Sequence, residues 1–298
     1  MTTSGMLLLD KPGGVTSHDV VATVRRIMGE RRVGHAGTLD PMATGLLIVA
    51  IGPATRLLRF VQAATKRYCG TVELGVATDS LDADGVEVER APVPDVDLAT
   101  VLAAAASLCG PQRQTPPMVS AVKVNGRRLH ELARRGIEVD RPARDVVVES
   151  FTVRAGADRH HWDFEVVCST GTYVRVLASD LARRLGTVGH LSALRRTAIG
   201  PHDVSSAVSL DDLEATVTEG RAPLMATTAM VSGLATVVVS DRDRFRILHG
   251  QRVRCESTEA DWLAAIDERG ELVAVLSRRG DSWQPAVVVA SDVDAPRR

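Results

Sequence analysis

Asp40 is the carboxylate whose sequence surroundings best suit chemistry. It lies in a glycine-rich segment, residues 33–45, where three glycines let the backbone turn tightly and approach a ligand closely. Because Pro41 disfavours helical backbone angles at the residue before it, Asp40 is predicted to be presented from a loop. Such a carboxylate can act in catalysis, or it can be an ordinary turn residue. The glycine spacing matches neither a phosphate-binding loop nor a dinucleotide fingerprint.

Basic side chains gather in two windows, although the chain as a whole is nearly neutral. It has 36 Lys and Arg against 37 Asp and Glu, so the net charge of −1 does not by itself indicate a nucleic-acid partner. Residues 20–70 hold eight basic side chains against two acidic ones, and residues 123–135 hold five against one. Each window is either a solvated surface or a surface that contacts phosphates.

Metal and disulfide chemistry find little support in the sequence. The four cysteines, Cys69, Cys109, Cys168 and Cys255, lie 40 or more residues apart, which matches neither zinc-type pairs nor a dense disulfide scaffold. We expect them to be reduced and buried. His160 and His161 have no metal-ligand partner at suitable spacing. We therefore expect no metal and no cofactor.

The composition, with 45% hydrophobic and 24% charged residues over 298 positions, is that of a soluble globular protein. The N-terminal segment carries no signal-peptide pattern and no run near the roughly 18 apolar residues that a membrane span needs. We therefore expect a cytoplasmic protein that does not associate with membranes.

The elements that must position these residues alternate irregularly between strand and helix patterns. This arrangement favours an α+β fold with a mixed, largely antiparallel central sheet and flanking helices. The predicted strands of this sheet are Met6–Leu9, Leu46–Ile51, Gly70–Val76, Val146–Val153 and Trp162–Cys168. The predicted helices include Ser17–Met28, with Ser17 as its N-cap, Leu98–Leu108 and Val174–Leu185.

A domain boundary is predicted after the helical segment Leu210–Thr218, where periodicity is lost. We assign residues 1–231 to a first domain and residues 232–298 to a second, small one. The second domain contains short β-runs and turns, which is the pattern of a β-barrel or sandwich. At this size it is expected to dock on the larger domain.

Six motifs follow one another between residues 8 and 175. They are Leu8-Leu-Asp-Lys-Pro-x-Gly-x-Thr-Ser17, Gly34-His-x-Gly-Thr-Leu-Asp40-Pro-x-Ala-Thr-Gly45, Lys66-Arg-Tyr68, Asp79-Ser-x-Asp82-Ala-Asp-Gly85, Gln114-Thr-Pro-Pro-Met-x-Ser-Ala-x-Lys123 and Gly171-Thr-Tyr-x-Arg175. In this order they resemble the bacterial tRNA pseudouridine-55 synthases of the TruB type. Beyond about residue 232 the resemblance is weak.

The resemblance implies a pseudouridine synthase fold with a small C-terminal PUA-like, β-rich domain. It also implies isomerisation of uridine 55 in the T-loop of tRNA: the N1–C1′ bond breaks, the uracil turns, and C5 joins C1′. No cofactor is consumed. The family match assigns the required carboxylate, the nucleophile, to Asp40, which attacks the sugar or the base, or deprotonates the sugar.

Further roles follow from the same resemblance. Arg175 is expected to pair with Asp40, lowering its pKa and fixing its orientation. Tyr68 is expected to stack on the flipped uracil and to take part in proton transfer, while Tyr173 and Leu194 line the pocket. Each of these side chains would otherwise be read as ordinary half-buried or surface structure.

Residues outside the pocket are implied to hold the RNA. His35 is expected to contact RNA and to occupy the space that the flipped base leaves, without acid–base chemistry. The segment from residue 114 to residue 138 resembles the family's mobile thumb loop. Its basic side chains are expected to contact phosphates: Lys123, Arg127, Arg128, Arg134 and Arg135.

The expected partner is therefore the T-arm of tRNA, bound by a monomer without a guide RNA or an obligatory protein partner. One rival is an RNA-binding protein that helps tRNA fold and for which isomerisation is secondary. A second rival is a guide-RNA-dependent synthase of the archaeal or eukaryotic type. The thumb-like insertion and the short C-terminal domain argue against the second rival.

Overall fold

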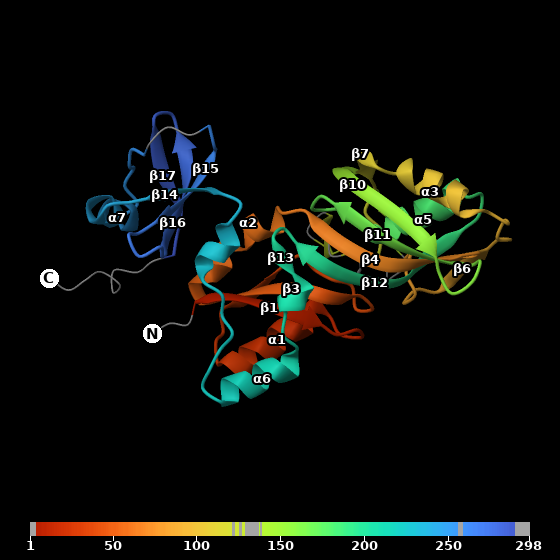
Figure 1. Cartoon of the computed structure of the whole chain (residues 1–298), viewed down its shortest axis with the longest axis horizontal. Coiled ribbons are helices and arrows are strands. Elements are labelled where there is room, and N and C mark those ends of the chain that lie inside the picture. The colour runs from red at the N-terminus through yellow and green to blue at the C-terminus, as the bar shows by residue number, and fades with distance from the viewer. Residues whose placement is uncertain are drawn as a thin grey trace.

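The computed structural model describes residues 4–120, 123–124, 127–128, 137, 139–255 and 259–289. Over these ranges the chain forms one large mixed sheet and one smaller sheet, which lie toward opposite ends of the molecule (Figure 1). Helices flank the large sheet, so the expected α+β class with a mixed central sheet is confirmed. None of the described helices is long and apolar enough to cross a membrane.

The large sheet has nine strands, and its pairs are antiparallel except where β12 meets β3. Its hydrogen-bonded path runs through β1 (Gly5–Lys11), β3 (Thr44–Ile51), β12 (Gly189–Ile199), β4 (Lys66–Leu74), β11 (His161–Cys168), β10 (Arg144–Ala155) and β7 (Gly110–Gln114). Two further strands lie off this path, β2 (Val33–Ala36) on β3 and β13 (His202–Asp203) on β12. Distant parts of the sequence therefore meet at the centre, where β3, β12 and β4 lie side by side.

Strand β12 is central to the sheet but absent from the sequence-based predictions. It contains polar residues, including His190 and Arg196, that are buried in the fold. Its pairing with β4 is also irregular, with register shifts between Leu191 and Ala193 and again just before Ala198. These irregularities interrupt the alternation of apolar and polar residues by which a strand is recognised.

Helix α1 spans the predicted residues, Ser17–Met28, but its N-cap is Thr16 rather than Ser17. The Thr16 hydroxyl accepts a hydrogen bond from the Asp19 N–H at 3.1 Å, and the Asp19 carboxylate accepts one from the Thr16 N–H at 2.8 Å. This reciprocal capping box satisfies the first turn of the helix. The Ser17 side chain is therefore available for another contact, described below.

Helices cover the sheet in two groups. Helix α1 and helix α6 (Leu210–Thr218) pack together over the apolar core that β1 and β3 provide (Figure 1). Helices α3 (Leu98–Ala106) and α5 (Val174–Arg184) cover the core formed by β4, β10 and β11. Short helical turns complete this part of the chain: η1 (Gly52–Leu57), α2 (Leu58–Gln62), η2 (Val204–Ser206) and η3 (Thr227–Val231).

Two small antiparallel strand pairs lie outside the large sheet. Strands β5 (Val76–Thr78) and β6 (Glu87–Arg90) pair with each other, and the turn between them carries the Asp79–Gly85 motif. Strands β8 (Lys123–Val124) and β9 (Arg127–Arg128) form a second antiparallel pair within the segment expected to be the thumb. The predicted contacts of Arg134 and Arg135 lie outside the described residues.

The smaller sheet has four strands, β14 (Ala235–Val238), β15 (Trp262–Ile266), β16 (Leu272–Arg279) and β17 (Ser282–Val288). Strands β14 and β15 are parallel, and helix α7 (Asp241–Leu248) lies between them in the sequence. The C-terminal β-rich unit is present as expected. In its described part the four strands form an open sheet with one helix, and the prediction of a barrel or sandwich stays a prediction. The crossover that α7 makes explains the parallel pair.

The smaller sheet packs against the large-sheet part of the chain through a shared apolar cluster. Residues of η1 and α2 contribute to it together with residues of β15, β16 and β17. The rings of Phe60 and Trp262 meet edge to face, with their centroids 5.5 Å apart. The Arg59 guanidinium lies 4.7 Å from the Phe60 ring centroid and 4.9 Å from that of Trp262.

The cysteines differ from the expectation in their burial. All four are free, but only Cys168 is buried, whereas Cys69 and Cys255 are half-buried and Cys109 is exposed. The prediction that all four are buried is wrong for the other three. Burial among apolar neighbours raises the pKa of the Cys168 thiol to about 11, so it stays protonated at neutral pH.

Candidate active site

A pocket of about 380 Å³ opens beside Asp40 at the centre of the large sheet. Its walls come from the loop that follows β2, from β4 and β12, and from the segment that leads into α5. Five residues selected from the sequence line it together: Asp40, Tyr68, Tyr173, Arg175 and Leu194. Residues separated by up to 154 positions in the chain thus face one cavity.

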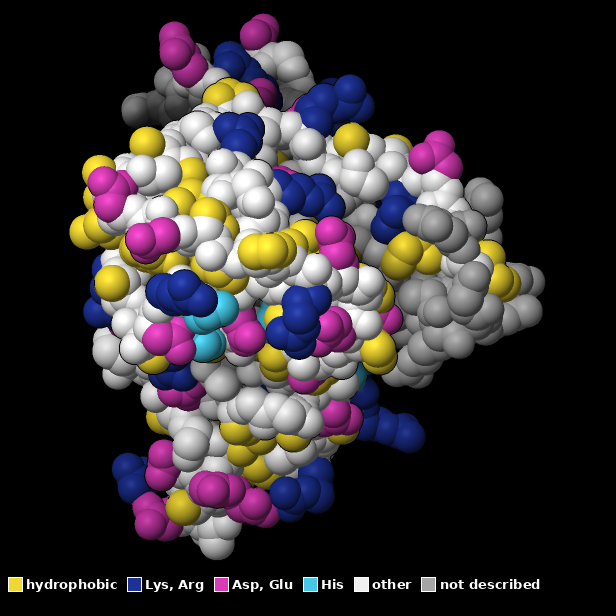
Figure 2. All heavy atoms as spheres, turned by 90° about the vertical axis from the view of Figure 1, so that its right-hand side faces the viewer, with side chains coloured by type: hydrophobic (Ala, Val, Ile, Leu, Met, Phe, Trp, Pro, Cys, Tyr) yellow, Lys and Arg dark blue, Asp and Glu magenta, His cyan; other side chains and the backbone are white. Residues whose placement is uncertain are grey.

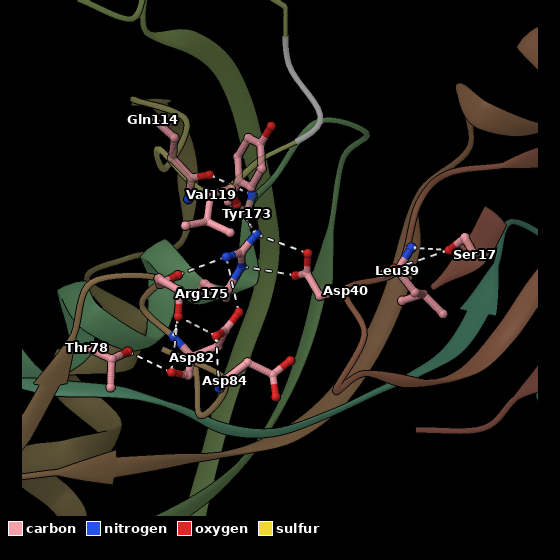
Figure 3. A network of polar contacts seen from close by, with 11 residues as sticks. Ser17, Leu39, Asp40, Thr78, Asp82, Asp84, Gln114, Val119, Tyr173 and Arg175 are labelled. Carbon is pink, nitrogen blue, oxygen red and sulfur yellow. Dashed lines mark hydrogen bonds and ion pairs between the residues drawn. The ribbon is translucent and has the colours of Figure 1, made fainter. Parts of the chain in front are cut away.

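The Asp40 carboxylate and the Arg175 guanidinium form a bidentate pair. Arg175 Nε lies 3.0 Å from Asp40 Oδ2, and Nη2 donates to Oδ1 at 3.0 Å (Figure 3). The Arg175 side chain is 3% exposed, whereas that of Asp40 is 33% exposed. The parallel contacts fix the plane of the carboxylate, and the exposed part of Asp40 remains open to a ligand in the pocket.

Arg175 is held by further acceptors on its other side. Its Nη1 lies 3.1 Å from Asp82 Oδ2 and donates to the Ser80 carbonyl at 2.8 Å, while Nη2 also donates to the Val119 carbonyl at 2.9 Å (Figure 3). Asp82 is itself buried. One guanidinium therefore bridges two carboxylates, which compensates for the burial of its charge.

The tight turn between β5 and β6 supplies these acceptors. Within it, Leu81 has φ 64°, the only non-glycine residue with positive φ in the described part of the chain. A Cβ atom at Gly85 would lie 2.2 Å from the Ser80 hydroxyl, so the turn requires glycine there. The Ser80 hydroxyl donates to Asp82 Oδ1 at 2.5 Å. This geometry fixes the Asp82 carboxylate toward Arg175.

The loop that carries Asp40 is fixed by contacts from two other segments. The Ser17 hydroxyl of α1 accepts a hydrogen bond from the Leu39 N–H at 2.9 Å and donates to the Leu39 carbonyl at 3.2 Å (Figure 3). On the other side of Asp40, the fully buried Lys11 donates to the Pro41 carbonyl at 3.2 Å. The backbone of Asp40 is thus held before and after the catalytic candidate.

Burial raises the pKa of Asp40 above its ordinary value, and the Arg175 guanidinium acts in the opposite direction. The negative charges of Asp82 and Asp84 add to the rise. Arg175 lowers the Asp40 pKa, as expected, but desolvation outweighs the ion pair and the net shift is upward. Arg175 thus limits the rise, and its two contacts orient the carboxylate.

Two buried cations, Arg196 and Lys66, lie on the pocket wall beside Tyr68. Arg196 Nε donates to the Leu46 carbonyl at 2.7 Å, and its Nη2 donates to the Gly37 carbonyl at 3.0 Å. Burial lowers the pKa of Lys66 to about 8. Sequence patterns alone assign neither residue a role in the pocket. The motif that contains Lys66 was a usable signal, whereas Arg196 lies in the unpredicted strand β12.

Tyr68 is 7% exposed, and burial raises the pKa of its phenol, with Arg196 acting in the opposite direction. Its hydroxyl therefore stays protonated at neutral pH and is available as a donor. Leu194, 8% exposed, provides an apolar wall on the neighbouring strand. A flat ring, an aliphatic wall and a few charged groups are the features that suit a nucleobase.

Tyr173 lies at the N-terminus of α5, where its side chain faces the pocket. The Tyr173 side chain makes no capping hydrogen bond to the first turn of the helix. Instead, the Gln114 side-chain carbonyl accepts a hydrogen bond from the Tyr173 N–H at 2.9 Å (Figure 3). The glutamine, at the end of β7, thus positions the start of the helix that carries Arg175. Gln114 belongs to a motif noted in the sequence, but no role was assigned to it there.

His35 does not line the pocket. It lies on β2, where its ring meets that of His18 edge to face at a centroid distance of 5.6 Å. Burial lowers the pKa of His35 to about 4, so its imidazole is neutral at physiological pH. This neutral state is compatible with the expected absence of acid–base chemistry at His35.

The remaining candidate residues are the basic ones that are expected to contact RNA phosphates. The backbones of Lys123, Arg127 and Arg128 form the β8–β9 pair. On the face drawn in Figure 2, basic and acidic side chains are interspersed. Among the residues the structure describes, no three His, Cys, Asp or Glu side chains come together as a metal site requires.

Two family models match consecutive parts of the chain. The model described as TruB family pseudouridylate synthase (N terminal domain) matches residues 25–174. The model described as tRNA pseudouridylate synthase B C-terminal domain matches residues 175–231. Together these segments contain every residue selected from the sequence that lines the pocket.

Similar proteins extend over nearly the whole chain. The tRNA pseudouridine synthase B of Thermobifida fusca (strain YX) is 44% identical over 96% of this chain and 98% of its own length. That of Leifsonia xyli subsp. xyli (strain CTCB07) is 43% identical over 98% of each. A chain in the crystal structure of a Cbf5-Nop10-Gar1 complex has a similar fold, with a TM-score of 0.74 and 26% identity over 96% of this chain and 84% of that one. The chain therefore belongs to the TruB family of tRNA pseudouridine synthases, which are isomerases.

Proposed function

We propose that the chain converts uridine 55 in the T-loop of tRNA to pseudouridine, with Asp40 as the catalytic carboxylate. The observation that carries this proposal is the bidentate Asp40–Arg175 pair at the floor of a pocket with the features of a nucleobase site. The substrate class follows from the family, whose curated members are named tRNA pseudouridine synthase B.

The pocket requires the target base to leave its stack. Tyr68 and Leu194 are both largely buried, so a uracil can contact them only after it has turned out of the RNA. The cost of unstacking is lowest for a base in a loop, which favours a T-loop uridine over one in a duplex. The thumb segment and the basic window of residues 20–70 are proposed to hold the surrounding phosphates.

The reaction exchanges one glycosidic bond for another and leaves no net product besides the isomer. The N1–C1′ bond breaks, the C5–C1′ bond forms, and the proton on C5 is lost while N1 gains one. The ionised Asp40 carboxylate attacks the sugar or the base, or removes a sugar proton. As the first bond breaks, negative charge grows on the base, and the neighbouring cations Arg196 and Lys66 favour that charge.

Proton transfer is assigned to Tyr68 in this scheme. Since burial keeps its phenol protonated, Tyr68 can donate a hydrogen bond to the base while its ring stacks on the uracil. The Tyr173 ring is proposed to close the opposite side of the pocket. Chemistry of this kind needs a positioned carboxylate and does not consume a cofactor.

The decisive experiment maps pseudouridine at single-nucleotide resolution in unmodified tRNA after incubation with purified protein and no added cofactor. Wild-type protein is expected to modify position 55. Asp40→Asn keeps the shape and removes the charge, so it is expected to abolish turnover and leave tRNA affinity largely unchanged. Asp95→Asn, which changes the same charge at an exposed position away from the pocket, serves as the matched control. Appreciable product from Asp40→Asn would refute the carboxylate assignment, and product at another position would refute the substrate site.

A further inference from the structure

A second pocket, of about 490 Å³, lies on the outer side of α5. It is formed by one face of this helix, by residues 113–118 and by the turn after β5. It shares no lining residue with the pocket beside Asp40. The proposed reaction therefore makes no use of it.

Gln114 lines the second pocket and is hydrogen-bonded to Tyr173, which lines the first. Its side-chain amide nitrogen has no partner among the described residues. Its side-chain oxygen accepts the hydrogen bond from the Tyr173 N–H, which is a donor only, so the oxygen must face Tyr173. The amide nitrogen must then face the other way, and the side chain lines the second pocket. Gln114 is 2% exposed, and its Nε2 has no hydrogen-bond partner among the described residues. A buried donor without a partner costs stability and points to an acceptor that a ligand supplies.

The remaining lining indicates the chemistry of that ligand. Apolar walls come from Leu81, Pro116, Pro117, Met118 and Val176, which suit the faces of a nucleobase. At the rim, the side chains of Arg113 and Arg183 are 73% and 71% exposed, as phosphate contacts require.

Charge limits how many phosphates this pocket can hold. Its exposed rim cations are Arg113 and Arg183, and the carboxylates Asp79 and Asp180 line it too. Asp180 lies 3.9 Å from Arg183 and takes up part of its charge. Arg113 likewise lies 3.8 Å from Asp145, so the partly neutralised rim suits a single phosphodiester and not a polyphosphate.

We propose that this second pocket, the α5 outer pocket, binds one unstacked ribonucleotide of the RNA substrate, with a base acceptor hydrogen-bonded to Gln114 Nε2 and the phosphate at the rim arginines. The inference rests on the proposed function, because the RNA is the substrate proposed above. Since the other end of Gln114 holds Tyr173 at the start of the helix that carries Arg175, occupancy of the pocket also steadies the active site. The same chemistry could come from a free nucleoside monophosphate.

The test measures binding of a T-arm hairpin RNA to the full chain by fluorescence anisotropy. Gln114→Glu keeps an acceptor for Tyr173 and replaces the donor that faces the pocket, and Arg183→Ala removes an exposed rim cation. Each is expected to weaken RNA binding about tenfold. Arg184→Ala is the matched control, because Arg184 is the next residue on α5, donates to Ser107 Oγ at 2.6 Å and does not line the pocket. Thermal melting shows whether the buried Gln114→Glu variant folds, and Arg183→Ala decides the result if it does not.

Competition by the four nucleoside 5′-monophosphates separates the two sources of ligand. No competition, together with weaker RNA binding in Arg183→Ala but not in Arg184→Ala, supports the proposal. Monophosphate binding that Arg183→Ala abolishes while RNA affinity stays at the wild-type value would assign the pocket to a free nucleotide and overturn the RNA source. Unchanged RNA affinity without monophosphate binding overturns the site itself. Pseudouridine formation by the wild type, measured on the same RNA, reports separately on the proposed function.

Discussion

The hydroxyl of Ser17 exchanges hydrogen bonds with both backbone groups of Leu39, accepting from its N–H at 2.9 Å and donating to its carbonyl at 3.2 Å. Leu39 is the residue before Asp40, and Ser17 is fully buried. The first turn of α1 therefore holds the loop that carries Asp40 in place through one side chain. Because Thr16 provides the cap of the helix, Ser17 serves the loop alone.

Ser17→Ala is accordingly expected to affect both stability and the chemical step. The substitution leaves two buried backbone groups of Leu39 without their side-chain partner, which costs about 1–3 kcal/mol in the free energy of unfolding. The single-turnover rate of pseudouridine formation should fall more than the affinity for tRNA, because Asp40 loses its fixed position. Ser150→Ala, at an exposed position, is the control. A Ser17→Ala protein that is less stable yet turns over at the wild-type single-turnover rate would limit Ser17 to a structural role.

Arg175→Lys is expected to shift the pH dependence of the rate. The lysine keeps a positive charge but loses the bidentate contact, so it lowers the Asp40 pKa less than arginine does. The Asp40 pKa is therefore expected to be higher in the variant than in the wild type. In the proposed mechanism the reaction requires the ionised carboxylate, so the rate is expected to be lost as the pH falls through the Asp40 pKa. The acid limb of the single-turnover profile should therefore move to higher pH, and the plateau should fall about 100-fold through misplacement of the carboxylate.

The comparison for Arg175→Lys is Arg184→Lys, which makes the same exchange on the same helix away from the pocket. This control should keep both the plateau and the acid limb. A loss in Arg175→Lys that is confined to tRNA affinity would place Arg175 on the RNA-binding surface instead of in the active site.

Asp82→Asn is expected to move the acid limb in the opposite direction. The negative charge of Asp82 raises the Asp40 pKa, so its removal lowers that pKa and extends the rate to lower pH. The plateau should nevertheless fall, because Arg175 loses the ion pair on its Nη1 side. Asp84→Asn separates these two effects, since Asp84 also raises the Asp40 pKa but makes no ion pair with Arg175. It should shift the acid limb the same way and keep the plateau; the same loss of plateau in both variants would contradict the positioning role of Asp82.

The contrast between Asp40 and Asp82 shows what the sequence could predict. Asp40 could be found because glycines and a proline flank it and because its motif resembles a known family. Asp82 occurs in a motif too, but nothing local indicates that its carboxylate faces Arg175, 93 positions further along the chain. That contact depends on how β5, β6 and α5 pack, and long-range packing leaves no trace in residue spacing.

The predicted elements show the same division. Helix α1 could be predicted residue by residue, because its apolar positions repeat with helical spacing. Strand β12 could not, because its buried Arg196 is satisfied by the carbonyls of Leu46 and Gly37 and looks like a surface residue in the sequence. Helix α7 was missed for a related reason, since short polar segments in a β-rich tail carry little periodic signal.

The C-terminal sheet provides the last prediction, through its contact with the rest of the chain. Arg59 and Phe60 of α2 pack on Trp262 of β15, and Arg56 donates to the Val288 carbonyl of the adjoining sheet at 3.0 Å. None of the described residues that line the Asp40 pocket lies beyond position 196. We propose that a domain boundary follows Val231 and that the smaller domain contributes to tRNA affinity and stability but not to chemistry.

Truncation after Val231 is therefore expected to give a folded enzyme with a lower melting temperature. The cut exposes the α2 side of the shared apolar cluster, and at this size each kcal/mol lost at the transition lowers the midpoint by about 2–4 °C. The single-turnover rate at saturating RNA should stay near the wild-type value, while affinity for full-length tRNA should fall more than affinity for an isolated T-arm. The newly exposed apolar surface is expected to favour aggregation, which Phe60→Ser in the truncated chain should reduce without altering the rate. If circular dichroism and a cooperative thermal transition show a folded truncated protein that has no single-turnover activity at saturating RNA, the C-terminal sheet takes part in the active site and the proposed boundary is wrong.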